Sequence, residues 1–125
     1  MPNNPGLTKS YATGGAVAGY RIVKYSADET VVQGAAATDL SIGVSARLGA
    51  ASGERCDVVR TGITEVEFGG NVARGAKLTS DADGKAVTAA PAQGVNNQII
   101  GIAEVSGVAG DIGSLLIAPS VMQGA

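Results

Sequence analysis

The sequence contains no histidine, and this absence excludes several kinds of chemistry. Histidine is the most frequent general base in proteins and the commonest metal ligand. Ser-His-Asp and Cys-His catalytic arrangements are therefore excluded, and one cysteine without histidine cannot form an ordinary zinc site. The 19 glycines form no phosphate-binding loop and no dinucleotide fingerprint. The sequence predicts a protein that is not an enzyme and has no cofactor or metal.

Cysteine and aromatic residues are scarce. The single cysteine, Cys56, rules out an intrachain disulfide, and we interpret it as a small buried hydrophobic residue. Hydrophobic residues make up 45 % of the chain but aromatic residues only 3 %, so the predicted core is thin. A chain of 125 residues fits one domain. A thin core suggests stabilisation by oligomerisation or by docking onto a larger body.

Clusters of positive charge and long hydrophobic runs are also missing. The formal net charge is −2 and the basic residues are scattered singly, which argues against direct binding to nucleic acid. No segment reaches the roughly 18 apolar residues that a membrane span needs. Residues 1–6 lack the charged start and apolar run of a signal peptide. We therefore expect a soluble, unprocessed intracellular product.

A β pattern is clearest between residues 53 and 84. Residues 64–68 alternate between acidic side chains and side chains that suit a packed face, as in a strand with one buried face. Gly62 interrupts the run from 55 to 68, which predicts two strand segments around a bend. The Asp-Ala-Asp-Gly sequence at 81–84 predicts a turn.

The rest of the chain predicts short strands and no long helix, because helical periodicity is absent and glycine is frequent. Residues 34–39 are interpreted as a helical turn or a loop, and residues 89–97 as a loop. The predicted fold class is all-β, a small barrel or sandwich with short irregular turns. Further strands are expected at 20–25, 30–33, 42–45, 85–88 and 113–118, the last one stopped by Pro119. The predicted organisation is an extended N-terminal arm at 1–15, a single β domain at 16–119 and a short C-terminal tail at 120–125.

The second half of the chain resembles the first, which suggests an internal duplication. Ile100–Ala103 matches Ile42–Ser45, and at the same spacing Leu116 matches Val58 and Ile117 matches Val59. With a small shift, residues 80–84 lie over residues 25–29. If the duplication is real, each half is a strand–turn–strand unit that cannot bury its face alone, and the two units pack together.

Two pairs of acidic residues could in principle do chemistry. Asp81 and Asp83 resemble the start of a calcium loop, but its twelfth position is occupied by Ala92 instead of an acidic residue, which favours a solvated turn. Glu65 and Glu67 share one face of a predicted strand, where such glutamates are ordinarily solvated. Neither pair predicts a site.

Three segments together resemble the small capsid cement, or head decoration, proteins of tailed bacteriophages. The segments are YRIVKYSADETVVQGAAATDLSIGVS, GERCDVVRTGITEVEFGGNVARGAKLTSDADGKAV and IIGIAEVSGVAGDIGSLLIAP, and the resemblance covers about residues 8–118. Its most specific parts are the runs at 58–66, 75–84 and 100–103. These runs are structural motifs, so no catalytic residues follow from them.

The resemblance implies a structural virion protein, made in the cytoplasm of the bacterial host, on the outer surface of the assembled capsid. Its implied partners are the major capsid protein and further copies of itself, as a homotrimer at three-fold and quasi-three-fold positions. Its implied role is to stabilise contacts between major capsid protein subunits, without nucleic acid or membrane. As a hypothesis, the N-terminal arm lies along the shell or a neighbouring copy. The predicted capsid-contact residues are Pro2, Asn3, Asn4, Pro5, Leu7, Lys9 and Tyr11.

Two other interpretations remain open from the sequence. A tail, tube or spike accessory protein of a phage would also be β-rich and oligomeric. A small-ligand β-barrel is a further alternative, although the scarcity of aromatic residues argues against a lined apolar pocket.

Overall fold

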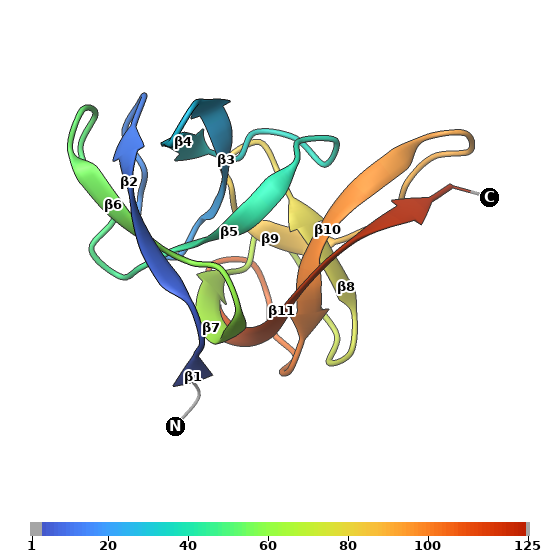
Figure 1. Ribbon diagram of the computed structural model, residues 1–125. Coiled ribbons are helices and arrows are strands. Elements are labelled where there is room, and N and C mark those ends of the chain that lie inside the picture. The colour runs from blue at the N-terminus through green and yellow to red at the C-terminus, as the bar shows by residue number, and fades with distance from the viewer. Residues whose placement is uncertain (1–3, 125) are drawn as a thin grey trace.

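The computed structural model describes residues 4–124, and their regular structure is entirely β (Figure 1). The strands are β1 (Asn4–Pro5), β2 (Thr8–Thr13), β3 (Ile22–Ala27), β4 (Thr30–Gln33), β5 (Ser41–Ser45), β6 (Arg55–Val59), β7 (Gly62–Glu67), β8 (Lys77–Ser80), β9 (Ala86–Thr88), β10 (Asn96–Ala103) and β11 (Ile112–Gln123). Within residues 4–124, no helix is long and apolar enough to cross a membrane. The predicted all-β class is confirmed.

The strands form a closed barrel and a second, curled sheet. Strands β2 to β6 close in the order β2-β4-β3-β5-β6, and we call them unit 1. The second sheet has the order β1-β7-β11-β10-β8-β9, and we call strands β7 to β11 unit 2. The predicted break at Gly62 is confirmed and marks the passage from unit 1 to unit 2, since β6 belongs to the barrel and β7 to the second sheet. In Figure 1 the free ends of β10 and β11 extend away from the barrel.

The two units repeat one topology. Strands β7, β8, β9, β10 and β11 correspond to β2, β3, β4, β5 and β6, and corresponding strands have corresponding neighbours. Part of the contact that closes the barrel is repeated as an isolated bridge, although the second sheet stays open. Thr13 pairs in parallel with Val31, and Phe68 and Ala86, each 55 positions later, form a parallel bridge. The predicted internal duplication is confirmed.

Backbone conformation supports the same correspondence. Two non-glycine residues adopt positive φ, Tyr20 at 61° and Glu29 at 55°. The residues 55 positions later are Gly75 at φ 88° and Gly84 at φ 74°. A left-handed conformation costs an ordinary residue roughly 1–2 kcal/mol. Both units therefore keep the same two backbone turns, although only unit 2 uses the residue that adopts them without strain.

The register of the last repeated strand differs from the prediction by one residue. Val59 lies opposite Val44 in unit 1, and Leu116 lies opposite Ile102 in unit 2. Leu116 therefore corresponds to Val59, and its predicted match with Val58 is wrong. The reason is a loop that covers residues 46–54 in unit 1 but only 104–111 in unit 2, one residue shorter.

Each unit has its own apolar core, and part of unit 1 is buried in the core of unit 2. The barrel core consists of Tyr11, Val17, Val23, Val31, Ile42, Cys56 and Val58. The second core combines residues of unit 2, among them Phe68, Leu78, Ile100 and Leu115, with Ile22, Val44 and Val59 of unit 1. The units are thus held together by apolar packing as well as by hydrogen bonds.

The N-terminal arm predicted at residues 1–15 is wrong for residues 8–13. These residues form β2, which pairs with both β6 and β4 and so completes the barrel. Tyr11 is only 1 % exposed. In a core with few aromatic residues, this large buried side chain and the pairing with β4 and β6 together offset the cost of ordering the segment.

The C-terminal tail predicted at residues 120–125 is also wrong, because β11 continues through Pro119 to Gln123. Strand β7 pairs with β11 only from Ile112 to Leu116. Beyond Leu116 one side of β11 is an open edge, where proline can be tolerated because no neighbouring strand requires its missing N–H. The predicted loop at 89–97 is correspondingly shorter, since β10 begins at Asn96.

Candidate interaction surfaces

Backbone hydrogen bonds join the two units directly. The N–H of Ile22 donates to the carbonyl of Gly84 at 2.8 Å, and the N–H of Glu67 donates to the carbonyl of Tyr20 at 2.9 Å. The corresponding groups of unit 1 bond to each other instead, from Ala12 N–H to Glu29 carbonyl at 3.3 Å. In unit 1 these backbone groups bond to each other and help to close the barrel. In unit 2 the equivalent groups bond to unit 1 instead and join the two units.

A half-buried ion-pair network reinforces this junction. Glu67 accepts from Arg21 and from Lys85, each at 3.2 Å, and its side chain is 21 % exposed. Arg21 also donates to the carbonyl of Asp83. The sequence predicts that Glu65 and Glu67 are both solvated. For Glu67 this is wrong, because its side chain forms ion pairs at this junction. Sequence reasoning missed the network because its members come from β7, from the segment before β3 and from the turn before β9.

We expect acid to weaken this junction. Burial alone would raise the pKa of Glu67, but hydrogen bonds from Lys85 and Arg21 outweigh burial and hold the pKa below its ordinary value of 4.5. A lowered folded-state pKa contributes stability that is present above the unfolded value and is lost as pH falls through the folded value. Urea unfolding should therefore show stability falling below about pH 4.5.

Glu67→Gln should reduce the loss of stability below about pH 4.5. It should also lower the free energy of unfolding at pH 7 by about 1 kcal/mol. The remaining acid sensitivity includes Asp39, whose pKa is lowered, against the effect of burial, by Lys24 and by backbone N–H groups. Glu104→Gln, at an exposed position, is the control and should leave the curve unchanged. If Glu67→Gln and the parent protein lost the same stability between pH 7 and acid pH, the proposed role of Glu67 in the acid sensitivity would be contradicted.

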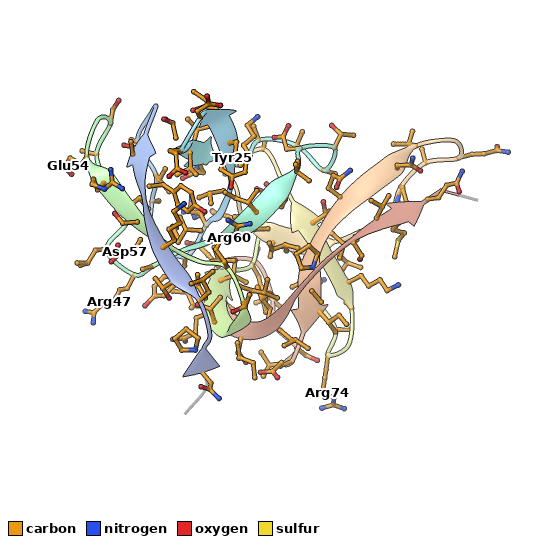
Figure 2. All side chains as sticks on the ribbon, in the orientation of Figure 1. Tyr25, Arg47, Glu54, Asp57, Arg60 and Arg74 are labelled. Atoms are coloured by element: carbon orange, nitrogen blue, oxygen red, sulfur yellow. The ribbon has the colours of Figure 1, made fainter. Side chains whose placement is uncertain are left out.

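One end of the unit 1 barrel carries a polar aromatic cluster. Arg60 donates to the hydroxyls of Tyr11 and Tyr25, whose rings meet edge to face with centroids 6.0 Å apart. The hydrogen bond with Tyr11 and the charge of Arg60 lower the pKa of Tyr25 below its ordinary value. Lys9 bridges to Glu29 at the rim. Figure 2 shows Arg60 below Tyr25 at this end of the barrel.

Beside this cluster, Tyr25 is 45 % exposed and lies against an open acidic groove. The groove has a volume of about 420 Å³ and is lined by Tyr25, Ala27, Asp28 and Glu29. We call this surface, with Ala12 at its edge, the mouth of unit 1. A partly exposed aromatic ring next to two carboxylates suits a partner that presents both apolar surface and positive charge.

The outer face of unit 2 presents a row of neighbouring side chains across four strands. Ile63 of β7 lies opposite Leu116 of β11, Leu116 opposite Ile102 of β10, and Ile102 opposite Lys77 of β8. Leu116 is 42 % exposed and Ile102 is 36 % exposed. We call these four residues the outer row of unit 2. No sequence signal pointed to this row, because it depends on the register between strands.

The predicted capsid-contact residues fall into three groups. Pro2 and Asn3 lie outside the described residues. Asn4, Pro5, Leu7 and Lys9 lie on the surface, with Leu7 57 % exposed, and β1 pairs with the edge of β7. Tyr11 points into the barrel core, so its prediction as a contact residue is wrong in this fold.

The Asp81–Gly84 turn uses its own carboxylate to hold its shape. One oxygen of Asp81 accepts the N–H groups of Asp83 and Lys85, at 2.8 and 2.9 Å. Within residues 4–124, no three histidine, cysteine or acidic side chains gather where they could hold a metal ion. The turn serves instead as the structural junction with unit 1.

Comparisons with known proteins place this fold among phage proteins. A solved structure described as the head fiber gp8.5 N base of bacteriophage phi29 has a TM-score of 0.71 at 21 % sequence identity, covering 94 % of this chain and 98 % of that chain. At this identity the likeness shows a shared fold. No curated protein matches the sequence. The family model for phage cement proteins matches residues 2–112. Because that match covers most of the chain, the chain belongs to the phage cement protein family.

Proposed function

We propose that this protein is a capsid cement, or decoration, protein that binds the outer surface of the assembled phage head. In this role it contacts the major capsid protein, forms a homotrimer on the shell and stabilises contacts between capsid subunits. It is made in the cytoplasm of the bacterial host and functions in the virion as a structural protein without catalytic activity. The observation that carries the proposal is the family match over residues 2–112.

The molecular features support a role in assembly. The barrel interior is filled by side chains such as Tyr11, Val17 and Val58, which argues against the small-ligand barrel considered from the sequence. Exposed apolar residues occur instead on outer surfaces, including the outer row of unit 2. Many copies on one shell stabilise it collectively even when each contact is weak, because binding to a repeating lattice is multivalent.

The direct test is co-sedimentation of the purified protein with expanded, cement-free capsids. Saturable binding in a fixed ratio to the major capsid protein is expected, together with a higher temperature of shell disruption. Absence of binding to matured shells would overturn the proposal. Binding to purified tails in place of shells would favour the tail, tube or spike alternative.

We further propose that the surface part of the N-terminal segment contacts the shell. Leu7→Asp combined with Lys9→Glu should weaken shell binding at least about tenfold, or roughly 1.4 kcal/mol for each copy. Deletion of residues 2–11 is unsuitable because it removes most of β2 from the barrel. Leu48→Asp, at a side chain that is 92 % exposed in a loop of unit 1, is the matched control. Equal occupancy for the double variant and the control would exclude this contact.

A further inference from the structure

The duplication shows how one unit of this fold receives another. In unit 1, Ile22, Val44 and Val59 lie side by side across β3, β5 and β6. They are between 0 and 5 % exposed and belong to the core of unit 2. We call the face of unit 1 formed by these three residues the docking face. The surface of unit 2 against which it packs is the receiving site.

The same face exists in unit 2 but is uncovered. By strand register, Lys77, Ile102 and Leu116 of the outer row occupy the places of Ile22, Val44 and Val59. Two of the three remain apolar, and no segment among residues 4–124 buries them as unit 2 buries their counterparts. Unit 2 thus has an exposed apolar face, whereas the equivalent face of unit 1 is buried against unit 2.

The polar edge of the receiving site also has a counterpart, whereas the apolar counterparts in unit 1, such as Tyr11 and Val58, are buried inside the closed barrel. Unit 2 receives unit 1 through Glu67, Asp83 and Gly84, whose places in unit 1 are taken by Ala12, Asp28 and Glu29. These three residues lie at the mouth of unit 1. In Figure 2, Tyr25 at this mouth is near the upper end of the molecule. Arg74, three residues before β8 begins at Lys77, is near the lower end.

The charges at the two free surfaces are complementary. Inside the chain, Arg21 beside the docking face meets the carboxylate of Glu67 and the carbonyl of Asp83. In the free surfaces, Lys77 lies at the end of the outer row, and Asp28 and Glu29 line the mouth, where Lys9 already pairs with Glu29. A cation on one surface and the Asp28 carboxylate on the other favour contact between unlike surfaces over contact between like surfaces.

We propose that the outer row of unit 2 docks onto the mouth of unit 1 of a second copy of this chain, where the exposed Tyr25 ring supplies apolar surface and the barrel edge repeats the backbone contact that joins the units within each copy. The contact is head to tail, and contacts of this kind close into rings when the rotation permits. The long bond from Ala12 to Glu29 opens, and the Glu29 carbonyl accepts the N–H of Lys77, as Gly84 accepts that of Ile22. The inference rests on the proposed homotrimer and names its surfaces, but it does not depend on attachment to the capsid.

The first test is sedimentation equilibrium of the full chain without capsids. The parent protein is expected to associate as its concentration rises to the millimolar range, and a strictly monomeric parent would overturn the proposal. Ile102→Asp with Leu116→Asp should weaken association at least about a hundredfold, because two charges enter an apolar contact. Leu48→Asp should associate like the parent. Circular dichroism melting checks that each variant is folded, and undiminished association of the folded double variant would also overturn it.

Charge reversal tests which surfaces meet. Lys77→Glu alone and Asp28→Lys with Glu29→Lys alone should each weaken association about tenfold, and the combined variant should recover most of the loss. Failure of the combination to recover any association would contradict the pairing. The rescue distinguishes a contact between these surfaces from a general effect of charge.

Disulfide trapping tests the direction of the contact. A mixture of Lys77→Cys and Glu29→Cys variants should give covalent dimers on mild oxidation, while either variant alone should not. The native Cys56 is buried, and burial raises the pKa of its thiol, so it is a poor competitor. Dimers of Lys77→Cys alone would show a symmetric contact and exclude the head-to-tail arrangement. Shell co-sedimentation is scored separately, so intact self-association without shell binding would refute the proposed function but not this inference.

Discussion

Phe68→Ala is expected to lower the free energy of unfolding by about 3–5 kcal/mol. Phe68 is the only phenylalanine, it is fully buried, and it forms the isolated parallel bridge with Ala86 in unit 2. Its ring packs directly against the backbone at Gly107 and Gly113, where an added Cβ would lie within 2.6–2.8 Å of ring atoms. Removing the ring leaves a cavity that this backbone cannot readily fill. Equilibrium unfolding in urea, followed by circular dichroism, measures the loss.

A double-mutant cycle separates this packing from a general loss of apolar area. Gly113→Ala alone should destabilise the protein, because its methyl group would meet the Phe68 ring and a Val105 methyl group. In the Phe68→Ala background the same methyl enters vacated space, so its cost should shrink by at least about 1 kcal/mol. Val121→Ala, at a side chain 55 % exposed, is the control. Strictly additive losses would contradict the proposed contact.

Val44→Asp is expected to destabilise the protein by on the order of 4 kcal/mol at pH 7, since full burial raises a carboxyl pKa by about three units or more. Val44 has no exposed surface and lies in the docking face between the units. The duplication provides a matched control, because Ile102 occupies the same place in unit 2 and is 36 % exposed. Ile102→Asp should change monomer stability by less than about 1 kcal/mol.

The comparison of these two variants tests the asymmetry of the fold. Equal losses for Val44→Asp and Ile102→Asp, measured by urea unfolding at low protein concentration, would show that the outer row of unit 2 is as buried as its counterpart. A large loss for Val44→Asp alone confirms that only one of two equivalent faces is engaged within the chain. The free face is then available to a partner.

Much of the secondary structure follows from local pattern. The predicted strand at 30–33 coincides with β4, and the strands predicted at 42–45 and 20–25 differ from β5 and β3 by one or two residues at their ends. Local pattern failed where tertiary pairing decided the outcome. Glycine and proline near the N-terminus suggested an arm, yet pairing with β4 and β6 draws residues 8–13 into the barrel. Pro119 was expected to end a strand, but its position on an open edge makes it tolerable.

Candidate surfaces were harder to predict than strands. Leu7 and Lys9 are exposed and stay predicted contact residues, whereas Tyr11 belongs to the core. The outer row and the mouth combine residues that are distant in the sequence. Whether each surface is free for a partner depends on which of the two similar units is buried against the other. Without the strand register, Leu116 could not be matched to Val59.

The all-β class and the repeat follow from local patterns in the sequence. The alternation of side chains, the glycine positions and the Ile-Gly-Val/Ile matches are local properties that two copies of one pattern must share. The sequence also excluded histidine chemistry, because a missing residue type cannot be restored by folding. That unit 1 closes and unit 2 stays open to receive it is set by tertiary packing. That choice depends on whether the backbone groups of Glu67 and Gly84 bond to each other or to Tyr20 and Ile22, and such competition is settled by packing between residues far apart in the chain.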